Sequence, residues 1–323
     1  MTQDETVPVS GRRYHVVLNA SSGTASMLGV TREQLAAGFG RRNILAEIDD
    51  DRDTPLAERI RTALASDADV IVAAGGDGTV TALAEAMVGS SRPLAILPLG
   101  TANMLARDLS VPLEVDGWLD QLEAMQPHAI DVGSVNGRFF LHKVVIGLIP
   151  ALAAGREHVR GQRNATAFLG FSRYFVRRLV RARRLAVEIT PRGGEPHIER
   201  VQSIAVANNS YAQGLGQFFS RPELDRGHLT LYVVKHLNLG DMLRLTTEMF
   251  LGNWQEDEAL MIDTIDAVRI RTRRKLVKVM FDGEIVTLHS PLDFSLRPRA
   301  LNILAPQRES LTSPIAGEQG EPA

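Results

Sequence analysis

The hydrophobic pattern of this 323-residue chain changes its period near residue 128, and this change limits the folds that the chain can adopt. Before this point, short apolar runs alternate with helical patterns, as in βαβ units that build a mainly parallel sheet. After it, strand-like runs follow one another between turn residues, as in an antiparallel sandwich or barrel. We therefore predict an α/β domain over residues 1–128 and a β-rich domain over residues 129–307, with a disordered tail over residues 308–323.

The same patterns predict individual elements. In the first domain we expect strands at 14–19, 70–74 and 94–97, and helices at 31–39, 56–65 and 80–88. In the second domain we expect strands at 138–145, 186–190, 203–207, 229–234, 267–271 and 278–288. Two helical insertions, at 165–184 and about 239–251, interrupt these strands.

The amino-acid composition excludes several classes of protein, and the charged residues are unevenly distributed along the chain. The chain has no cysteine, so disulfides, thiolate metal sites and a cysteine nucleophile are excluded. Its first residues lack the basic patch and apolar run of a secretory signal, so we expect a cytoplasmic protein. The formal net charge is −2, but residues 1–130 hold 10 Lys and Arg against 18 Asp and Glu, and the remainder holds 26 against 20. The second half is therefore the basic half.

The sharpest local signal is the run Gly75-Gly76-Asp77-Gly78-Thr79, which directly follows a predicted buried strand and opens a predicted helix. Glycines let backbone N–H groups approach a ligand closely, and a helix N-terminus carries a partial positive charge that suits phosphate. Asp77 is unexpected there unless it holds Mg²⁺, orients a metal-bound water or accepts a proton. The plain alternative is a tight turn in which Asp77 caps the helix.

A second loop repeats this arrangement after the next strand, in the run Leu97-Pro98-Leu99-Gly100-Thr101-Ala102-Asn103. Thr101 can cap the helix or donate its hydroxyl to a phosphate oxygen, and Asn103 can reach the same ligand. Because loops that follow successive parallel strands meet at one edge of the sheet, the two loops together indicate a nucleotide. Neither contains a Walker motif, and the four lysines at 143, 235, 275 and 278 do not fit a P-loop NTPase or a protein kinase.

These two loops, together with the late run Phe281-Asp282-Gly283-Glu284, resemble the diacylglycerol kinase catalytic domain family, which includes bacterial lipid kinases and sphingosine kinases. The resemblance implies an N-terminal α/β domain similar to NAD kinase, a β-rich C-terminal domain, ATP and Mg²⁺ as cofactors, and a lipid hydroxyl as acceptor. It also implies roles for individual residues. Those expected to contact the nucleotide are Asn19, Gly75, Gly76, Asp77, Gly78, Thr79, Val80, Thr81, Thr101 and Asn103. Asp77 is also expected to take part in catalysis, together with Asp282 and Glu284.

The resemblance implies that Asp282 or Glu284 accepts the proton of the lipid hydroxyl, and we favour Glu284. A carboxylate in a partly desolvated cleft has a raised pKa and can help to deprotonate an alcohol. Alone, Asp282-Gly283 between two alternating runs would be no more than a hairpin turn.

The chain departs from the family pattern at three positions. Met104 and His142 stand where an aspartate and an asparagine are common, and Arg226 replaces an aspartate in a metal-binding loop. Either Asp225 takes over as metal ligand, or the site is lost and the guanidinium supplies the positive charge. We favour the loss.

A basic segment in the second half suggests a partner. Residues 156–184 contain nine arginines and one acidic residue, and Phe168, Phe171 and Phe175 form one helical stripe opposite Arg173, Arg177 and Arg181. Such a helix is typical of binding to an anionic membrane surface, and the alternative is an apolar stripe packed on the β-domain with solvated arginines. Nucleic acid is not expected as a partner, because no nucleic-acid-binding motif accompanies the charge.

The leading hypothesis is an ATP- and Mg²⁺-dependent kinase that docks transiently on the inner face of the membrane and phosphorylates diacylglycerol or a sphingoid-like base. The first alternative is an NAD kinase, which shares the Gly-Gly-Asp-Gly motif and the fold type. The second is a non-catalytic protein that binds lipid or nucleotide, suggested by Arg226 and Met104. The oligomeric state is left open, with a homodimer as one option.

Overall fold

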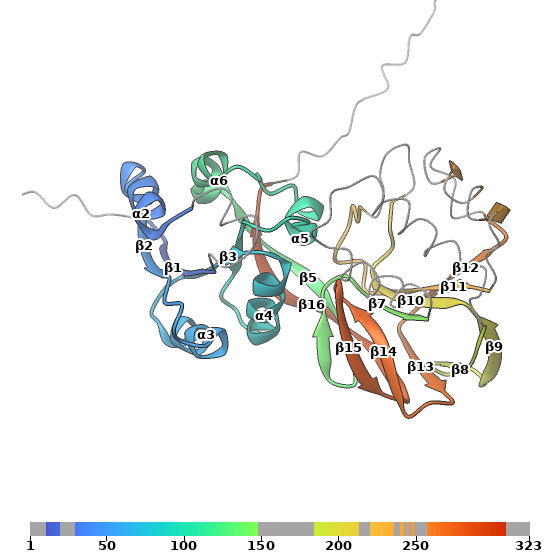
Figure 1. Cartoon of the computed structure of the whole chain (residues 1–323). Helices are drawn as coiled ribbons and strands as arrows, with labels where there is room; N and C mark the ends of the chain where they lie inside the picture. The colour runs from blue at the N-terminus through green and yellow to red at the C-terminus, as the bar shows by residue number, and fades with distance from the viewer. Residues whose placement is uncertain are drawn as a thin grey trace, which may run out of the picture.

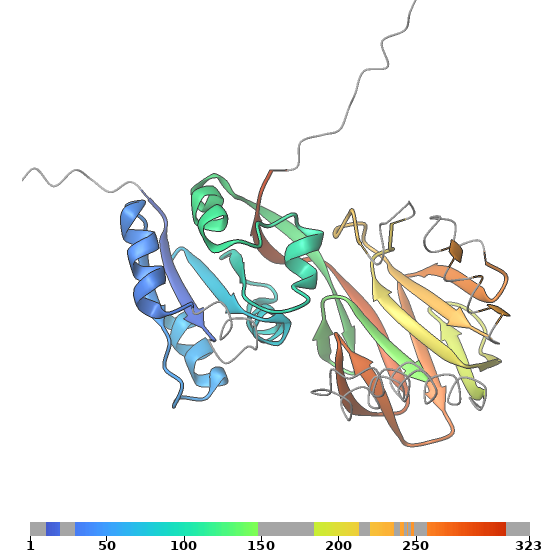
Figure 2. The ribbon, with the colours of Figure 1, turned by 45° about the horizontal axis from the view of Figure 1, so that its top comes forward.

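A computed structural model describes residues 11–19, 30–147, 184–212, 220–235 and 257–307, and also residues 240, 241, 244, 247 and 248. Figures 1 and 2 show two lobes, one of alternating strands and helices and one of strands, which two long strands connect. The predicted helix at 165–184, apart from its last residue, lies outside the described residues, as do the predicted tail and most of the predicted helix near 239–251.

The first lobe is built on a parallel sheet, as the sequence predicts. Its strands lie in the order β2-β1-β3-β4 and are all parallel, with bounds β1 Arg13–Leu18, β2 Leu45–Asp49, β3 Val70–Gly75 and β4 Leu94–Pro98. The helices that connect or follow these strands are α2 Arg32–Arg41, α3 Leu56–Ala65, α4 Asp77–Met87, α5 Met104–Asp108 and α6 Val115–Gln121, with a short 3-10 helix at Leu122–Ala124. Every residue of β3 is buried, which explains its nearly continuous apolar sequence.

Two long strands connect the lobes. β5 (Gln126–Val135) and β16 (Leu292–Ala305) pair antiparallel over most of their length. The last residues of β16 then run parallel to β4, with Ile303 opposite Leu94. Leu301, Ile303 and Leu304 are completely buried in the core of the first lobe. The last residues of β16 therefore belong to the core of the first lobe. A single boundary at residue 128 leaves them out of that lobe.

The second lobe is the predicted antiparallel sandwich. One layer continues the first sheet through β16, β13 (Ala267–Thr272), β8 (Leu185–Pro191) and β9 (His197–Val201), and β6 (Arg138–Phe140) pairs with β5. The other layer has the order β12-β11-β10-β7-β14-β15, with bounds β12 Leu260–Ile265, β11 Leu229–Val234, β10 Ser203–Asn208, β7 Lys143–Gly147, β14 Leu276–Phe281 and β15 Glu284–His289. Phe140 packs edge-on against Phe281 and Phe294 at the centre of the core between the layers.

Candidate functional site

The first glycine-rich loop has the predicted position between β3 and α4. α4 begins after Gly76 with no side chain capping its N-terminus, so that end of the helix is open to an anion. The Asn19 amide at the end of β1 donates to Thr79 Oγ1 at 2.9 Å, which ties the first strand to the loop. A β-carbon at Gly75 would lie 2.7 Å from Thr79 Oγ1, so this approach requires glycine.

The second loop packs directly against the first. A β-carbon at Gly100 would lie 2.6 Å from the Cα atom of Gly76, so the two backbones meet through glycines. Asn103 has a positive φ of 49° and closes its loop, because its side-chain oxygen accepts from Gly100 N and its amide donates to Gly100 O, both at 2.8 Å. The structure therefore brings the two predicted loops together at one edge of the sheet.

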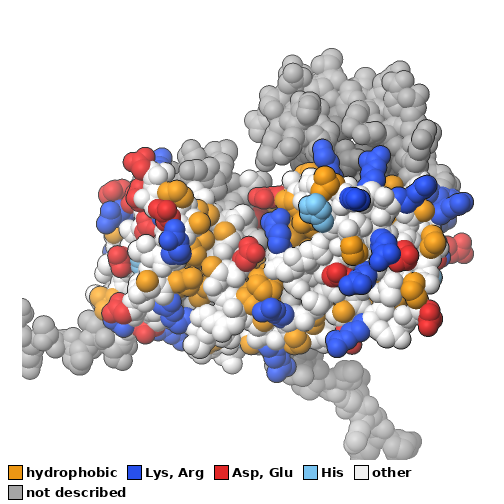
Figure 3. All heavy atoms as spheres, turned by 90° about the horizontal axis from the view of Figure 1, so that it is seen from below, with side chains coloured by type: hydrophobic (Ala, Val, Ile, Leu, Met, Phe, Trp, Pro, Cys, Tyr) orange, Lys and Arg blue, Asp and Glu red, His pale blue; other side chains and the backbone are white. Residues whose placement is uncertain are grey.

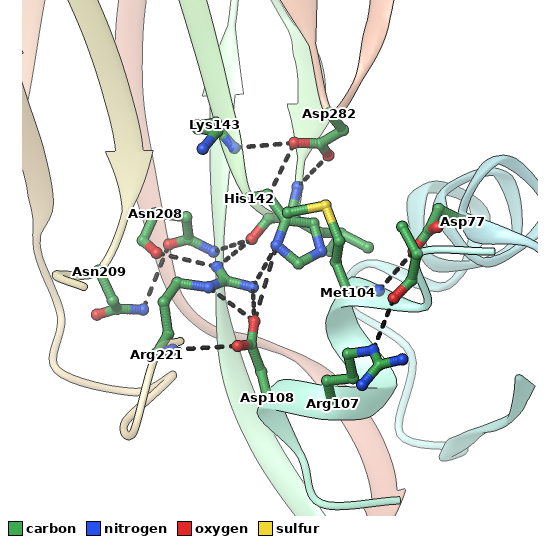
Figure 4. Close-up of polar contacts among 12 residues, drawn as sticks. Asp77, Met104, Arg107, Asp108, His142, Lys143, Asn208, Asn209, Arg221 and Asp282 are labelled. Carbon is green, nitrogen blue, oxygen red and sulfur yellow. Dashed lines mark hydrogen bonds and ion pairs between the residues drawn. The ribbon is translucent and has the colours of Figure 1, made fainter. Parts of the chain in front are cut away.

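Asp77 joins these two loops. Its carboxylate oxygens accept the backbone N–H group of Asn103 at 3.1 Å and that of Met104 at 2.8 Å, and Figure 4 shows the contact with Met104. Asp77 thus caps the helix that starts at Met104, whereas the plain alternative from the sequence had it capping its own helix. Its carboxylate has a structural task in holding the cradle together.

The other predicted nucleotide contacts differ in their exposure. Thr101 is exposed on the second loop and Thr81 is half-buried. The Val80 side chain is buried in the core of the first lobe. Val80 could therefore face a ligand only through its backbone.

The hairpin between β14 and β15 turns at Asp282-Gly283, and both residues have positive φ. The Asp282 carboxylate accepts the backbone N–H groups of Leu141, His142 and Lys143 at 2.6, 2.9 and 2.9 Å. Burial raises the pKa of Asp282, and the three N–H donors act in the opposite direction. These bonds also explain why the predicted continuous strand at 138–145 is split into β6 and β7.

Glu284 is exposed at the start of β15 and faces the first loop. A β-carbon at Gly78 would lie 3.4 Å from Glu284 Oε1, so the carboxylate from the second lobe lies beside the glycine-rich loop of the first. The two predicted parts of the site, far apart in the sequence, are thus neighbours. Of the two acidic residues in this turn, Asp282 is engaged by the backbone and Glu284 faces the loop.

Sequence reasoning missed a buried ion pair that connects the lobes. Arg221 is fully buried, and its guanidinium donates to Asp108 Oδ2 at 2.6 and 2.9 Å. It also donates to the carbonyl of Asn208 and to Nδ1 of His142, at 3.0 and 2.7 Å (Figure 4). No local pattern signals this pair, because Asp108 and Arg221 lie 113 positions apart.

His142 and Lys143 are both affected by this cluster. Burial, followed by the charges of Arg221 and Lys143, holds the pKa of His142 well below its usual range, so the ring is neutral and Nδ1 accepts from Arg221. Burial lowers the pKa of Lys143 to about 8, and its ammonium lies 5.0 Å from the centre of the Tyr211 ring. The cluster supports the Asp282-Gly283 turn, and Glu284 directly follows this turn.

The loop expected to bind a metal holds ion pairs. Arg226 pairs with Glu223. The Asp225 side chain is half-exposed, and its Oδ2 lies 3.8 Å from Nη2 of Arg299. The buried carboxylate of Asp131 accepts from Gly227 N and Arg299 N at 2.7 and 2.9 Å. Nowhere in the described part of the chain do three His, Asp or Glu side chains cluster as metal ligands would. Whether Asp225 binds a metal or the site is lost stays a prediction.

The predicted membrane-contact residues Phe168, Phe171, Arg173, Phe175, Arg177 and Arg181 lie outside the described residues. Within the described residues, none of the helices has the length and apolar content that crossing a membrane requires.

Comparisons with known proteins match both lobes. Residues 13–135 match the diacylglycerol kinase catalytic domain family, and residues 151–305 match the YegS C-terminal NAD kinase β-sandwich-like domain. A probable lipid kinase YegS-like protein of Pseudomonas fluorescens is 28% identical over 263 residues, which cover 80% of this chain and 83% of the relative. A diacylglycerol kinase of Staphylococcus aureus is 24% identical over 243 residues, covering 74% of this chain and 75% of the relative.

A solved structure shares the fold. The crystal structure of a putative diacylglycerol kinase from Bacillus anthracis matches with a TM-score of 0.66 and 21% identity, over 92% of this chain and 98% of that one. Together, the two matched domains confirm the resemblance that the glycine-rich loops and the Asp282 turn suggested. The chain therefore combines a region that matches the diacylglycerol kinase catalytic domain family with a region that matches the YegS C-terminal, NAD kinase β-sandwich-like domain.

Proposed function

We propose that this protein transfers the γ-phosphoryl group of ATP to the hydroxyl group of a lipid, diacylglycerol or a sphingoid-like base. The observation that carries the proposal is the position of the Glu284 carboxylate beside Gly78, at the open N-terminus of α4. An anion-binding loop and an exposed carboxylate from the facing lobe provide one place for a phosphate and a base for the group that attacks it.

In the proposed reaction, the backbone of Gly75–Thr79 and the loop around Thr101 hold the phosphates of ATP. Glu284 accepts the proton of the lipid hydroxyl while the oxygen of that hydroxyl bonds to the γ-phosphorus of ATP. The bond between the γ-phosphorus and the oxygen that bridges it to the β-phosphorus breaks, and ADP is released. Asp77 and Asp282 act as positioning residues, because both carboxylates accept backbone N–H groups.

Magnesium enters the proposal only as a companion of the nucleotide. Mg²⁺ prefers one or two carboxylates together with substrate phosphates over a cage made by the protein alone. When bound with ATP, it would offset the negative charge of the phosphates.

The experiment that tests the function is phosphoryl transfer from γ-labelled ATP to separate lipid classes, followed by mass spectrometry of the product. We expect label in a phosphorylated lipid, with no transfer to NAD under the same conditions. Transfer to NAD alone would instead assign the chain to the NAD kinases. ATP binding with neither ADP release nor labelled product would identify a non-catalytic binding protein.

Transient docking on the membrane by residues 165–184 remains a prediction from the sequence, and we include it in the proposed function. It rests on the basic and aromatic stripes of that segment.

A further inference from the structure

A second basic element lies within the described residues, at the turn between β13 and β14. Residues 267–281 contain six basic residues and no acidic residue. The charges of two of the six are compensated by acidic side chains. Arg269 pairs with Asp293, and Arg271 Nε lies 3.7 Å from Glu188 Oε1. The other four side chains are exposed, and no ion pair to another described residue is found for any of them: Arg273, Arg274, Lys275 and Lys278.

The turn that carries these cations is held in place by hydrogen bonds. The Thr272 hydroxyl donates to the carbonyl of Arg274 at 2.8 Å, and Thr272 N donates to Ser290 Oγ at 3.0 Å. Ser290 N donates in turn to the carbonyl of Lys275 at 2.9 Å. The cations are therefore displayed from an ordered backbone, so little backbone entropy is lost when they bind a partner.

Exposed leucines accompany the charge. Leu276 directly follows the basic residues and is 55% exposed, and Leu185 at the start of β8 is 39% exposed. The register places Thr272 opposite Val187, so Leu185 lies at the same end of the sheet as the turn. Figure 3, which views this end from below, shows Lys and Arg side chains gathered over the β-rich lobe with hydrophobic side chains among them.

We propose that the polybasic turn, which we define as Arg273, Arg274 and Lys275 between β13 and β14, is an electrostatic tether that binds an anionic membrane surface, with Lys278 on β14 adding to its charge. Cations with an exposed leucine fit a bilayer, where the charges meet anionic headgroups and the leucine enters the interface. The turn contains no aromatic side chain on which a base could stack, which disfavours a nucleic acid. The arginine-rich segment 156–184 also ends at the residue before β8, at this end of the lobe.

The tether is separate from the proposed reaction site. β14 has six residues and carries the polybasic turn at one end and the Asp282 turn at the other, a span of roughly 20 Å at about 3.3 Å per residue. The polybasic turn therefore holds the protein at the membrane without contacting the phosphates of ATP. A protein that does not bind the membrane through this turn can therefore be distinguished from one that does not transfer phosphate.

The test is sedimentation of the full chain with phosphatidylcholine–phosphatidylglycerol vesicles. The triple variant Arg273→Gln, Arg274→Gln and Lys275→Gln should bind about a hundredfold more weakly, because three cations are lost near an anionic surface. The matched control is Arg32→Gln, Arg52→Gln and Arg61→Gln, three exposed arginines of the first lobe, which changes the net charge equally and should bind as the wild type does.

Two further measurements complete the test. Leu276→Gln should weaken vesicle binding several-fold without affecting any binding to duplex DNA, and added salt should weaken binding of the wild type. Turnover on detergent-dispersed lipid should be the same in the triple variant and the wild type, while the apparent KM on vesicles rises. Unchanged vesicle binding by the triple variant, an equal loss in the control, or a loss confined to DNA would each overturn the tether.

Discussion

At the scale of single residues, the two acidic side chains of the β14–β15 turn have different tasks although they stand two positions apart. Asp282 accepts three backbone N–H groups, so its removal would leave those donors without an acceptor. Glu284 is exposed and lies beside the glycine-rich loop. The sequence alone offered both as the base, and only the contacts of the folded chain separate them.

This difference predicts opposite results for two variants. Glu284→Gln should lower the rate of phosphoryl transfer by about 10²–10⁴-fold while leaving the free energy of unfolding unchanged within about 0.5 kcal/mol. Asp282→Ala should instead lower the free energy of unfolding by about 2–4 kcal/mol. Urea unfolding and a lipid phosphorylation assay on the same preparations provide the check. Full turnover by Glu284→Gln would remove it from the reaction.

At the scale of elements, prediction succeeded where one segment carries its own signal. The helix expected at 56–65 has those bounds, and β3 and β4 are found where apolar runs indicated them. β2 and β12 were missed because both are sheet-edge strands, with one and no buried residues respectively, so neither shows a clear alternation. β16 was missed because its pairing with β4 depends on a return from the second lobe that local patterns do not encode.

The return of β16 has a measurable consequence. Ile303 is fully buried in the core of the first lobe, although it lies about 200 positions beyond most of that core. Ile303→Ala should lower the free energy of unfolding by about 2–5 kcal/mol, because a buried aliphatic side chain is replaced by a cavity.

The matched control is Ile198→Ala at a site that is 73% exposed, where the cost should stay within about 0.5 kcal/mol. Urea unfolding followed by tryptophan fluorescence, to which Trp118 in the core of the first lobe contributes, reports both variants. Equal stability of the two variants would show that β16 does not support the first lobe.

At the scale of the whole molecule, the candidate site exists only because the lobes are locked together. The glycine-rich loops come from residues before 104, and Glu284 comes from near the end of the described chain. β5 and β16 connect the lobes, and the buried pair of Arg221 and Asp108 fixes α5 against the second lobe. The sequence could predict the two halves of the site from their motifs, but not the long-range contacts that bring them together.

The charge distribution also becomes informative only when the whole molecule is considered. The net charge of −2 hides an acidic first lobe and a basic second half. The structure places four basic side chains with no described ion-pair partner near one turn of the second lobe, away from the Asp282 turn. The inference is a nucleotide held between the lobes of a protein that is tethered through its β-rich lobe.

We propose that the two glycine-rich loops and Glu284 form one phosphoryl-transfer site between the lobes. A crystal structure of the protein with a non-hydrolysable ATP analogue tests it most directly. We predict that the phosphates lie on the backbone of Gly75–Thr79, with the γ-phosphate on the side that faces Glu284. Phosphates bound away from this loop, or a γ-phosphate directed away from Glu284, would rule out this site.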